Sequence, residues 1–139
     1  TISEYEAQAA MMLQREAELF KGEMKERYPV LLERDLLHYK EMINAIIFDL
    51  ERGVDKREIA YKFHCWVVET MIVGIKGIAP KRVVFSGGCF QNLLLLQILE
   101  KELKKMRVEY YFNELVPAND AGIALGQLVF LTPGQNAHE

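Results

Sequence analysis

The stretch from residue 82 to residue 112 constrains the fold of this chain more than any other part. Arg82-Val83-Val84-Phe85 is a short β-branched and aromatic run between Pro80 and Gly87, which predicts a buried strand. A Ser86-Gly87-Gly88 turn follows, residues 90–106 return to helical spacing, and residues 108–112 predict a second strand. A strand, a helix and a strand in this order predict an α/β fold in which the two strands are parallel and the crossover is right-handed.

A first helix is predicted at the N-terminus. Ser3 followed by Glu6 forms a capping box, so the helix should begin there. It should end or break near Gly22 or at the Tyr28-Pro29 pair. Its apolar stripe is predicted to be Ala9, Ala10, Leu13, Ala17 and Phe20.

Two further helices precede the first strand. The second is predicted over residues 35–52, with Gly53 as its C-terminal stop. The third should begin at a cap formed by Asp55 and Glu58 and end before Pro80. The inward-facing side chains of the second helix are predicted to be Leu36, Met42, Ile43, Ile46, Ile47 and Leu50. Those of the third helix are predicted to be Ile59, Phe63, Trp66, Val67, Thr70, Met71 and Ile75.

The whole chain, 1–139, has the length of one domain. Within it we distinguish a helical part over residues 1–79 and a β-α-β-α part over residues 80–131, which ends in a helix predicted over residues 120–130. Residues 132–139 are predicted to form a frayed tail. The expected architecture is therefore three helices followed by strand, helix, strand and helix.

Charge and composition exclude several classes of protein. The net charge is −3 and basic residues alternate with acidic ones, so no nucleic-acid-binding face is expected. The longest apolar runs are far shorter than a membrane span, and the polar N-terminus is not that of a signal peptide. Two cysteines, Cys65 and Cys89, cannot form a disulfide framework, so we expect a reducing cytoplasm. The first residue is Thr1, which suggests a piece trimmed from a longer chain.

Two loops carry the candidate chemistry. Gly87 and Gly88 follow the first strand, where bare backbone and a helix N-terminus could admit a phosphate or nucleotide; the alternative is an ordinary turn. Asn119 and Asp120 follow the second strand, where a carboxylate could hold a divalent metal; the alternative is an N-cap. Because ligands gather at the carboxyl ends of strands in open α/β sheets, both loops should open on the same edge.

The sequences of these loops resemble a known family. Ser86-Gly87-Gly88-Cys89-Phe90-Gln91-Asn92 and Pro117-Ala118-Asn119-Asp120-Ala121-Gly122-Ile123-Ala124-Leu125-Gly126-Gln127 are similar to the end of HypF carbamoyltransferases, which mature NiFe hydrogenases. Residues 2–13 and 59–64 are similar to the same family, so the resemblance spans nearly the whole chain. The tRNA threonylcarbamoyl transferases share this region, but the Phe90-Gln91-Asn92 and Leu125-Gly126-Gln127 segments favour the hydrogenase branch.

The resemblance implies an actin-like ATPase fold with two ribonuclease-H-like lobes around a nucleotide cleft, of which this chain is the helix-rich second lobe. It implies that Gly87 and Gly88 let the nucleotide approach and that Asn92 helps to hold its ribose or base. Asp120 matches the family's metal-ligand aspartate. The paired histidines of that metal site lie in the other lobe, and the histidines here, His38, His64 and His138, include no such pair.

The resemblance also implies a reaction and its partners. The parent would form carbamoyl-adenylate from carbamoyl phosphate and ATP. It would then pass the carbamoyl group to the C-terminal cysteine of a HypE-type acceptor protein. Both the other domains of the parent chain and this acceptor would be partners of the chain. Since the acylphosphatase, zinc-binding and adenylate-forming domains of the family are absent from these 139 residues, we expect the chain alone to be inactive.

The chain departs from the family pattern at several positions. Ala121 replaces the first of two glycines after the aspartate, and Cys89 replaces a valine. Gln14 and Ala7 stand where the family has Glu and Gly. These departures keep a second hypothesis open, namely a non-catalytic interaction module that retains the fold without the nucleotide site.

Catalytic residues cannot be assigned from the sequence. Cys89 follows the glycines near a helix N-terminus, where a thiol can become nucleophilic; small-residue packing is the alternative. His64 is interpreted either as a hydrogen-bonded core histidine or as a residue of the cleft.

Overall fold

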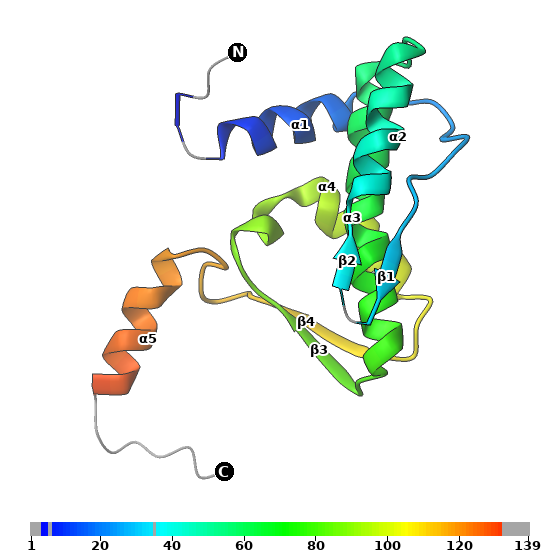
Figure 1. The fold of residues 1–139 in the computed structure, drawn as a ribbon. Coiled ribbons are helices and arrows are strands. Elements are labelled where there is room, and N and C mark those ends of the chain that lie inside the picture. The colour runs from blue at the N-terminus through cyan, green and yellow to red at the C-terminus, as the bar shows by residue number, and fades with distance from the viewer. Residues whose placement is uncertain (1–3, 6, 35, 132–139) are drawn as a thin grey trace.

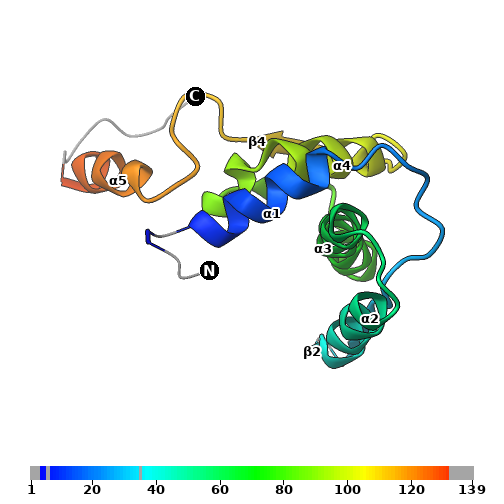
Figure 2. The same ribbon diagram turned by 90° about the horizontal axis from the view of Figure 1, so that it is seen from above.

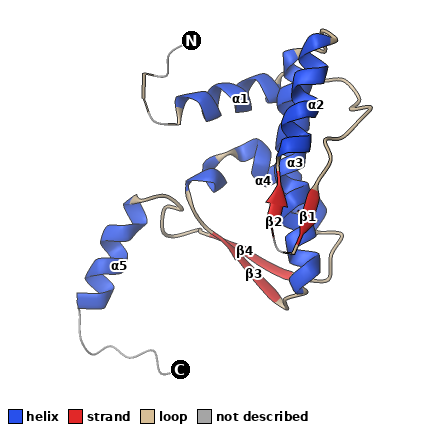
Figure 3. Cartoon of the chain, viewed as in Figure 1, coloured by secondary structure: helices blue, strands red, loops and turns tan. Residues whose placement is uncertain are grey.

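The computed structural model describes residues 4–5, 7–34 and 36–131 and shows a mixed α/β chain (Figures 1 and 3). The capping box predicted at Ser3 and Glu6 and the tail predicted over residues 132–139 lie outside the described residues. The elements are α1 (Gln8–Glu18), β1 (Leu31–Glu33), β2 (Leu36–His38), α2 (Lys40–Glu51), α3 (Lys56–Ile78), β3 (Arg82–Phe85), the 3-10 helix η1 (Gly88–Gln91), α4 (Leu93–Leu103), β4 (Glu109–Phe112) and α5 (Ala121–Leu131).

The predicted strand–helix–strand unit is confirmed. β3 and β4 pair in parallel, with Arg82 opposite Glu109 and Phe85 opposite Phe112, and α4 forms the crossover between them. Side chains alternate along a strand. Val83 therefore lies on the same face as the two phenylalanines, and this face packs on the main hydrophobic core.

The main core lies between α3, α4 and the inner face of the β3–β4 sheet. Leu99 and Leu103 of α4 are completely buried, because an apolar side chain recurs on this face every three or four residues. A parallel pair of only two strands has little hydrogen bonding of its own, so this packing is what stabilises it. The buried members of the cluster are Val68, Ile72, Phe85, Leu95, Leu99 and Leu103.

Helix α3 runs through the centre of the molecule. Figure 2 shows it between α2 on one side and the α1 and α4 layer on the other. Its start is confirmed, since the Asp55 carboxylate accepts a hydrogen bond of 2.9 Å from the Arg57 N–H. It ends at Ala79, which has left-handed backbone, directly before Pro80 as predicted.

The predicted start of the first helix is wrong. Glu4 and Tyr5 are not helical, and Ala7 adopts a left-handed conformation with φ of 64° that prevents the helix from extending further toward the N-terminus. The Gln8 side chain instead accepts a hydrogen bond from the Glu4 N–H. At its other end the helix finishes at Glu18, before the predicted break at Gly22.

The second helix was predicted too long, because a hairpin occupies its first part. β1 and β2 pair antiparallel, with Leu31 opposite His38, and Arg34 in the connecting turn has left-handed backbone. Leucine is common in both helices and strands, so its spacing did not reveal the turn. The C-terminal stop is confirmed: Gly53 has a φ of 70°, which favours glycine.

The burial predicted for the second helix and the first strand was also too extensive. Of the side chains predicted to face inward, only Met42 and Ile46 of α2 do so, because α2 packs against α3 along one side. Leu36, which lies in β2, and Ile43, Ile47 and Leu50 of α2 are exposed. In β3 only Phe85 is buried, whereas Val84 is 71% exposed, since nothing in the described residues covers the outer face of the sheet.

Across the described residues we find no helix of the length and apolarity that a membrane span requires.

A buried polar triad joins α2 and α3 to the segment before the hairpin. The Asp49 carboxylate accepts hydrogen bonds from Lys62 Nζ at 2.5 Å and from the Tyr28 hydroxyl at 2.9 Å. The Lys62 ammonium also lies 4.5 Å from the centre of the Tyr28 ring. Burial alone would raise the pKa of Asp49, but the bonds from Lys62 and Tyr28 outweigh it and hold that pKa below its ordinary value. The triad therefore contains a buried ion pair.

Removing one member of this triad should destabilise the chain more than removing all of its polar groups. Asp49→Ala leaves the Lys62 ammonium buried without a counter-ion, so we expect the free energy of unfolding to fall by about 3–5 kcal/mol. The combination of Asp49→Leu, Lys62→Met and Tyr28→Phe leaves no unpaired group and should lose less. Urea denaturation of both variants measures the difference. A larger loss in the triple variant would contradict this account.

Candidate functional site

The two predicted loops begin at the same edge of the sheet. Because β3 and β4 are parallel and their last residues, Phe85 and Phe112, lie opposite each other, the chain leaves both strands on one side (Figure 1). The first exit leads through Ser86 into the two glycines, and the second leads through residues 113–118 to Asn119 and Asp120. The expectation that both loops open on one edge is confirmed.

The two glycines differ in what the fold demands of them. Gly87 has a φ of 112° and a ψ of 160°, in a region that is essentially restricted to glycine. Gly88 has no such conformation, and a Cβ added to it would meet no atom of the described chain within 4 Å. The turn therefore requires a glycine at 87, whereas the fold leaves room for a side chain at 88.

The helix after the glycines begins later than predicted. Residues 88–91 form the 3-10 helix η1, and α4 starts only at Leu93. Phe90 fixes this short turn: its ring lies 5.4 Å from that of Phe85, and its N–H donates to the Gly87 carbonyl at 3.0 Å. The N–H groups nearest to the glycines therefore belong to η1 rather than to a regular α-helix.

Asn92 links the end of this turn to α3. Its Oδ1 accepts a hydrogen bond of 2.9 Å from the Leu95 N–H, so Asn92 is the N-cap of α4. Its amide nitrogen lies 2.9 Å from Nε2 of His64. His64 is 4% exposed, and its Nδ1 lies 2.8 Å from the Ala60 carbonyl oxygen. His64 is thus the hydrogen-bonded core histidine of the two alternatives. The sequence signal for the cap is an Asn directly before an apolar run.

In the second loop the helix cap and the candidate metal ligand are separate residues. Asn119 Oδ1 accepts a hydrogen bond of 3.1 Å from the Ala121 N–H, so Asn119 caps α5. Asp120 is exposed beside it, and its backbone carbonyl accepts from the Ile123 N–H. No group of three or more His, Cys, Asp or Glu side chains that could hold a metal occurs among the described residues. The Asp120 carboxylate is therefore free of capping, but it has no set of partner ligands among the described residues.

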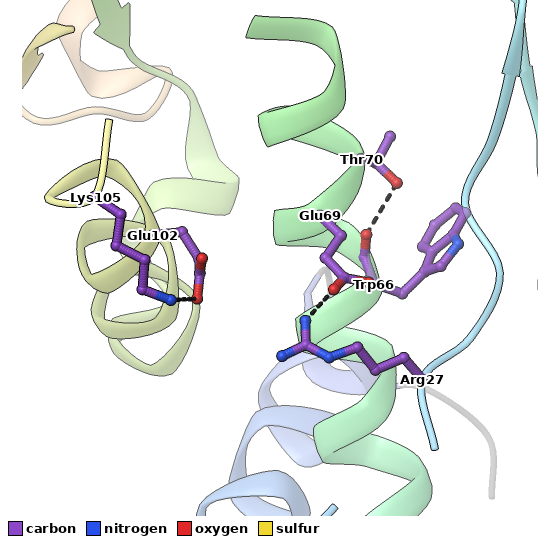
Figure 4. A network of polar contacts seen from close by, with 6 residues as sticks. All are labelled: Arg27, Trp66, Glu69, Thr70, Glu102 and Lys105. Carbon is purple, nitrogen blue, oxygen red and sulfur yellow. Dashed lines mark hydrogen bonds and ion pairs between the residues drawn. The ribbon is translucent and has the colours of Figure 1, made fainter. Parts of the chain in front are cut away.

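The cysteines lie in different environments. Burial raises the pKa of the Cys65 thiol, which keeps it protonated and a poor nucleophile. Cys65 lines a cavity of about 230 Å³ that also includes Arg27 and Glu69, which form an ion pair (Figure 4). Cys89 is exposed in η1, next to the glycines. Of the two, only Cys89 lies near the candidate site.

Comparison with known proteins shows the family of this chain. The family described as "Carbamoyltransferase, Kae1-like Domain, second subdomain" matches residues 1–127. The carbamoyltransferase HypF of Synechocystis sp. is 33% identical over 129 residues, which are 90% of this chain and 16% of that protein. A tRNA N6-adenosine threonylcarbamoyltransferase of Legionella pneumophila is 39% identical over 72 residues, 49% of this chain and 22% of that protein.

A solved structure of a relative has a similar fold. The crystal structure of a full-length HypF in its phosphate- and nucleotide-bound form superimposes with a TM-score of 0.77 at 35% identity, covering 91% of this chain and 21% of that chain. The chain therefore spans only about a sixth to a fifth of the length of these relatives.

Alanine substitutions should separate the roles of the two glycines. Gly87→Ala forces a side chain into a glycine-only conformation, so the free energy of unfolding should fall by about 1–3 kcal/mol. Gly88→Ala introduces no clash and should leave it within about 1 kcal/mol of the original value. Urea denaturation of the two single variants compares them directly. Equal losses would show that both glycines serve the fold.

Proposed function

The chain belongs to the HypF carbamoyltransferase family, as the second subdomain of its Kae1-like domain, and on this basis we propose that it is the nucleotide-binding lobe of a longer parent enzyme. Its fold is the helix-rich second lobe of that family's α/β, actin-like domain, which the nucleotide-bound HypF structure shares. The relatives that define the family are carbamoyltransferases, which supports a carbamoyltransferase role for the parent.

We propose that the parent carbamoyltransferase depends on ATP. It forms carbamoyl-adenylate from carbamoyl phosphate and ATP, with release of phosphate and pyrophosphate. It then transfers the carbamoyl group to the C-terminal cysteine thiol of a HypE-type acceptor protein in hydrogenase maturation, with release of AMP. The cytoplasm is the proposed setting, which agrees with two cysteines that are both free. When bound, ATP would supply the adenylyl group that activates the carbamoyl unit, and this lobe would supply part of the surface that holds the nucleotide.

The observation that carries the nucleotide proposal is the open backbone at Gly88. Gly74, Gly77 and Gly126 are equally open, so open space alone does not indicate a ligand site. Gly88 differs from them in its position, where backbone without a side chain admits a ligand. Gly88 adjoins the carboxyl edge of a parallel sheet, where ligands of α/β proteins bind. A related full-length HypF has been solved in a phosphate- and nucleotide-bound form, which supports a nucleotide ligand for the parent.

Gly87, Gly88 and Asn92 have distinct tasks in this proposal. Gly87 shapes the turn through its unusual backbone conformation. Gly88 leaves the space in which phosphate or ribose oxygens approach the backbone. Asn92 uses one lone pair and one N–H within the chain, which leaves its amide a second lone pair and a second N–H. These remaining groups suit hydrogen bonds to a ribose hydroxyl or a base edge.

We propose that Asp120 is one ligand of a divalent metal ion in the complete parent. A single carboxylate does not hold such an ion against water, so the remaining ligands must come from elsewhere. In the family pattern they are histidines of the other lobe. That Asn119 rather than Asp120 caps α5 supports this role, because the Asp120 carboxylate is left exposed for other contacts.

The other domains of the parent chain are proposed as the first partner. α5 is apolar except for Gln127 and contains no buried residue, and Figure 2 shows it projecting away from the other helices. Exposed apolar surface of this extent is typical of an interface. A second set of apolar side chains is exposed on the outer side of α2, including Ile43, Ile47 and Phe48.

A non-catalytic interaction module remains the alternative function. The exposed apolar faces of α2 and α5 favour it, since they need no nucleotide. The two hypotheses differ in what Gly88 does: an interaction module tolerates a side chain there, whereas a nucleotide site does not.

Gly88→Val in the full-length parent tests the nucleotide site. A branched side chain fills the space beside the backbone, so one class of ATP site should be lost in calorimetric titration. The family pattern places a second ATP-using domain in the parent, so a second class of site should persist. Gly77→Val is the matched control, because Gly77 is an exposed glycine near the far end of α3. Unchanged ATP binding by Gly88→Val would overturn the assignment and favour the interaction module.

Asp120→Ala and Asn119→Ala in the parent separate metal binding from helix capping. Asp120→Ala should abolish carbamoyl transfer and lower the metal content, and its melting temperature should equal that of the metal-free parent. Asn119→Ala removes the cap of α5, which costs about 1 kcal/mol, and should keep the metal. Metal analysis and thermal unfolding of both variants decide the matter. Normal metal content together with a lowered melting temperature in Asp120→Ala would mean that Asp120 has only a structural role.

A further inference from the structure

His64 and Asn92 form a hydrogen-bonded bridge from the central helix to the candidate nucleotide turn. His64 lies in the middle of α3 and is almost completely buried. Its two ring nitrogens contact different partners, the Ala60 carbonyl oxygen at 2.8 Å and the Asn92 amide nitrogen at 2.9 Å. The bridge joins two segments that lie 28 residues apart in the sequence.

The partners fix the direction of every bond in this bridge. A carbonyl oxygen only accepts, so Nδ1 of His64 carries the proton and donates to Ala60. Nε2 of the neutral ring is then an acceptor. The Leu95 N–H donates to Asn92 Oδ1 at 2.9 Å, so the NH₂ group of Asn92 faces His64 and donates to Nε2. Each group has the one role that its partner requires.

This bridge determines the orientation of Asn92. The Leu95 bond fixes the amide oxygen and the His64 bond fixes the amide nitrogen, so the side chain is held at both ends. Asn92 is also the residue at which η1 ends and α4 begins. Phe90 anchors the middle of the same turn against Phe85. Loss of the His64 acceptor would leave the amide plane free to rotate about its remaining bond.

We propose that His64 is a positioning residue for adenine-nucleotide binding, acting through Asn92. The inference rests on the proposed function, in which Asn92 contacts the ribose or base. His64 itself is buried below the turn and touches no ligand. It holds the Asn92 amide so that its second N–H and second lone pair point outward in one arrangement. Fixing this arrangement before binding reduces the entropy lost when the nucleotide binds.

Two conservative variants divide the functions of the His64 ring. The amide of Asn reaches to about the position of Nδ1, so His64→Asn keeps the donor to Ala60 and loses the acceptor for Asn92. The amide of Gln reaches to about the position of Nε2, so His64→Gln keeps that acceptor. Val68→Ala on the same helix is the stability control, because Val68 is buried in the main core and its side chain has no polar group that could bond to Asn92.

The measurement is ATP titration of the full-length parent by calorimetry, in parallel with thermal unfolding. The relevant ATP site is the one that Gly88→Val eliminates. We expect His64→Asn to weaken this site about tenfold, the equivalent of one good hydrogen bond. His64→Gln should stay within about threefold of the original affinity. Val68→Ala should lower the melting temperature without changing the affinity. In an Asn92→Ala background, His64→Asn should cause no further loss.

The outcomes distinguish this inference from the proposed function. If Gly88→Val eliminates a site but His64→Asn binds ATP normally, the role of His64 is overturned and the nucleotide site stands. If the affinities of all variants follow their melting temperatures, including Val68→Ala, His64 is only structural and the inference is also overturned. If Gly88→Val changes nothing, the nucleotide site itself is rejected and the inference with it.

Discussion

Helix α3 is buried over most of its circumference, and its faces position the other elements. Ala60 packs against Ala17 of α1, Lys62 pairs with Asp49 of α2, and Val68 packs in the core beneath the parallel sheet. A fourth contact, from His64 to Asn92, reaches the turn after β3. A helix enclosed in this way can carry polar groups only where each has a partner, and no buried side-chain nitrogen or oxygen among the described residues lacks one. The same helix therefore supports both the core and the candidate site.

The sequence predicted well the parts of the fold that depend on local signals. Asp55 at the start of α3, Gly53 after α2 and Pro80 before β3 act within one turn of the chain, and all three were predicted. The hairpin was missed because its two-residue turn, around Arg34, carries none of the glycine or asparagine that usually marks such turns. The His64–Asn92 bond was missed because it joins distant segments, although each residue had been singled out separately. Capping is readable from a sequence, whereas pairing across the core is not.

The outer surface explains why apolar residues were predicted inward but lie outward. Parallel sheets are normally covered on both faces, yet Val84 and Tyr111 on the outer face of β3 and β4 are exposed. The apolar side chains on the outer side of α2 and nearly all of α5 are exposed as well. The apolar spacing in the sequence thus predicts more buried side chains than the described residues bury. This agrees with the proposal that further domains of a longer parent cover these faces.

The departure from the family pattern at Ala121 falls where the fold accepts a side chain. Ala121 is the first residue of α5, is exposed, and contributes its backbone N–H to the Asn119 cap, a role that any residue except proline can fill. Gly122 is the position that the loop restricts, because an added Cβ would lie 3.0 Å from the Pro117 carbonyl oxygen. Gly122, the glycine that the loop needs, is therefore retained. Position 121, where Ala121 replaces a glycine of the family, does not require glycine for its backbone. Ala121 accordingly gives no structural reason to prefer the interaction module over the nucleotide-binding lobe, and the difference between them depends on Gly88.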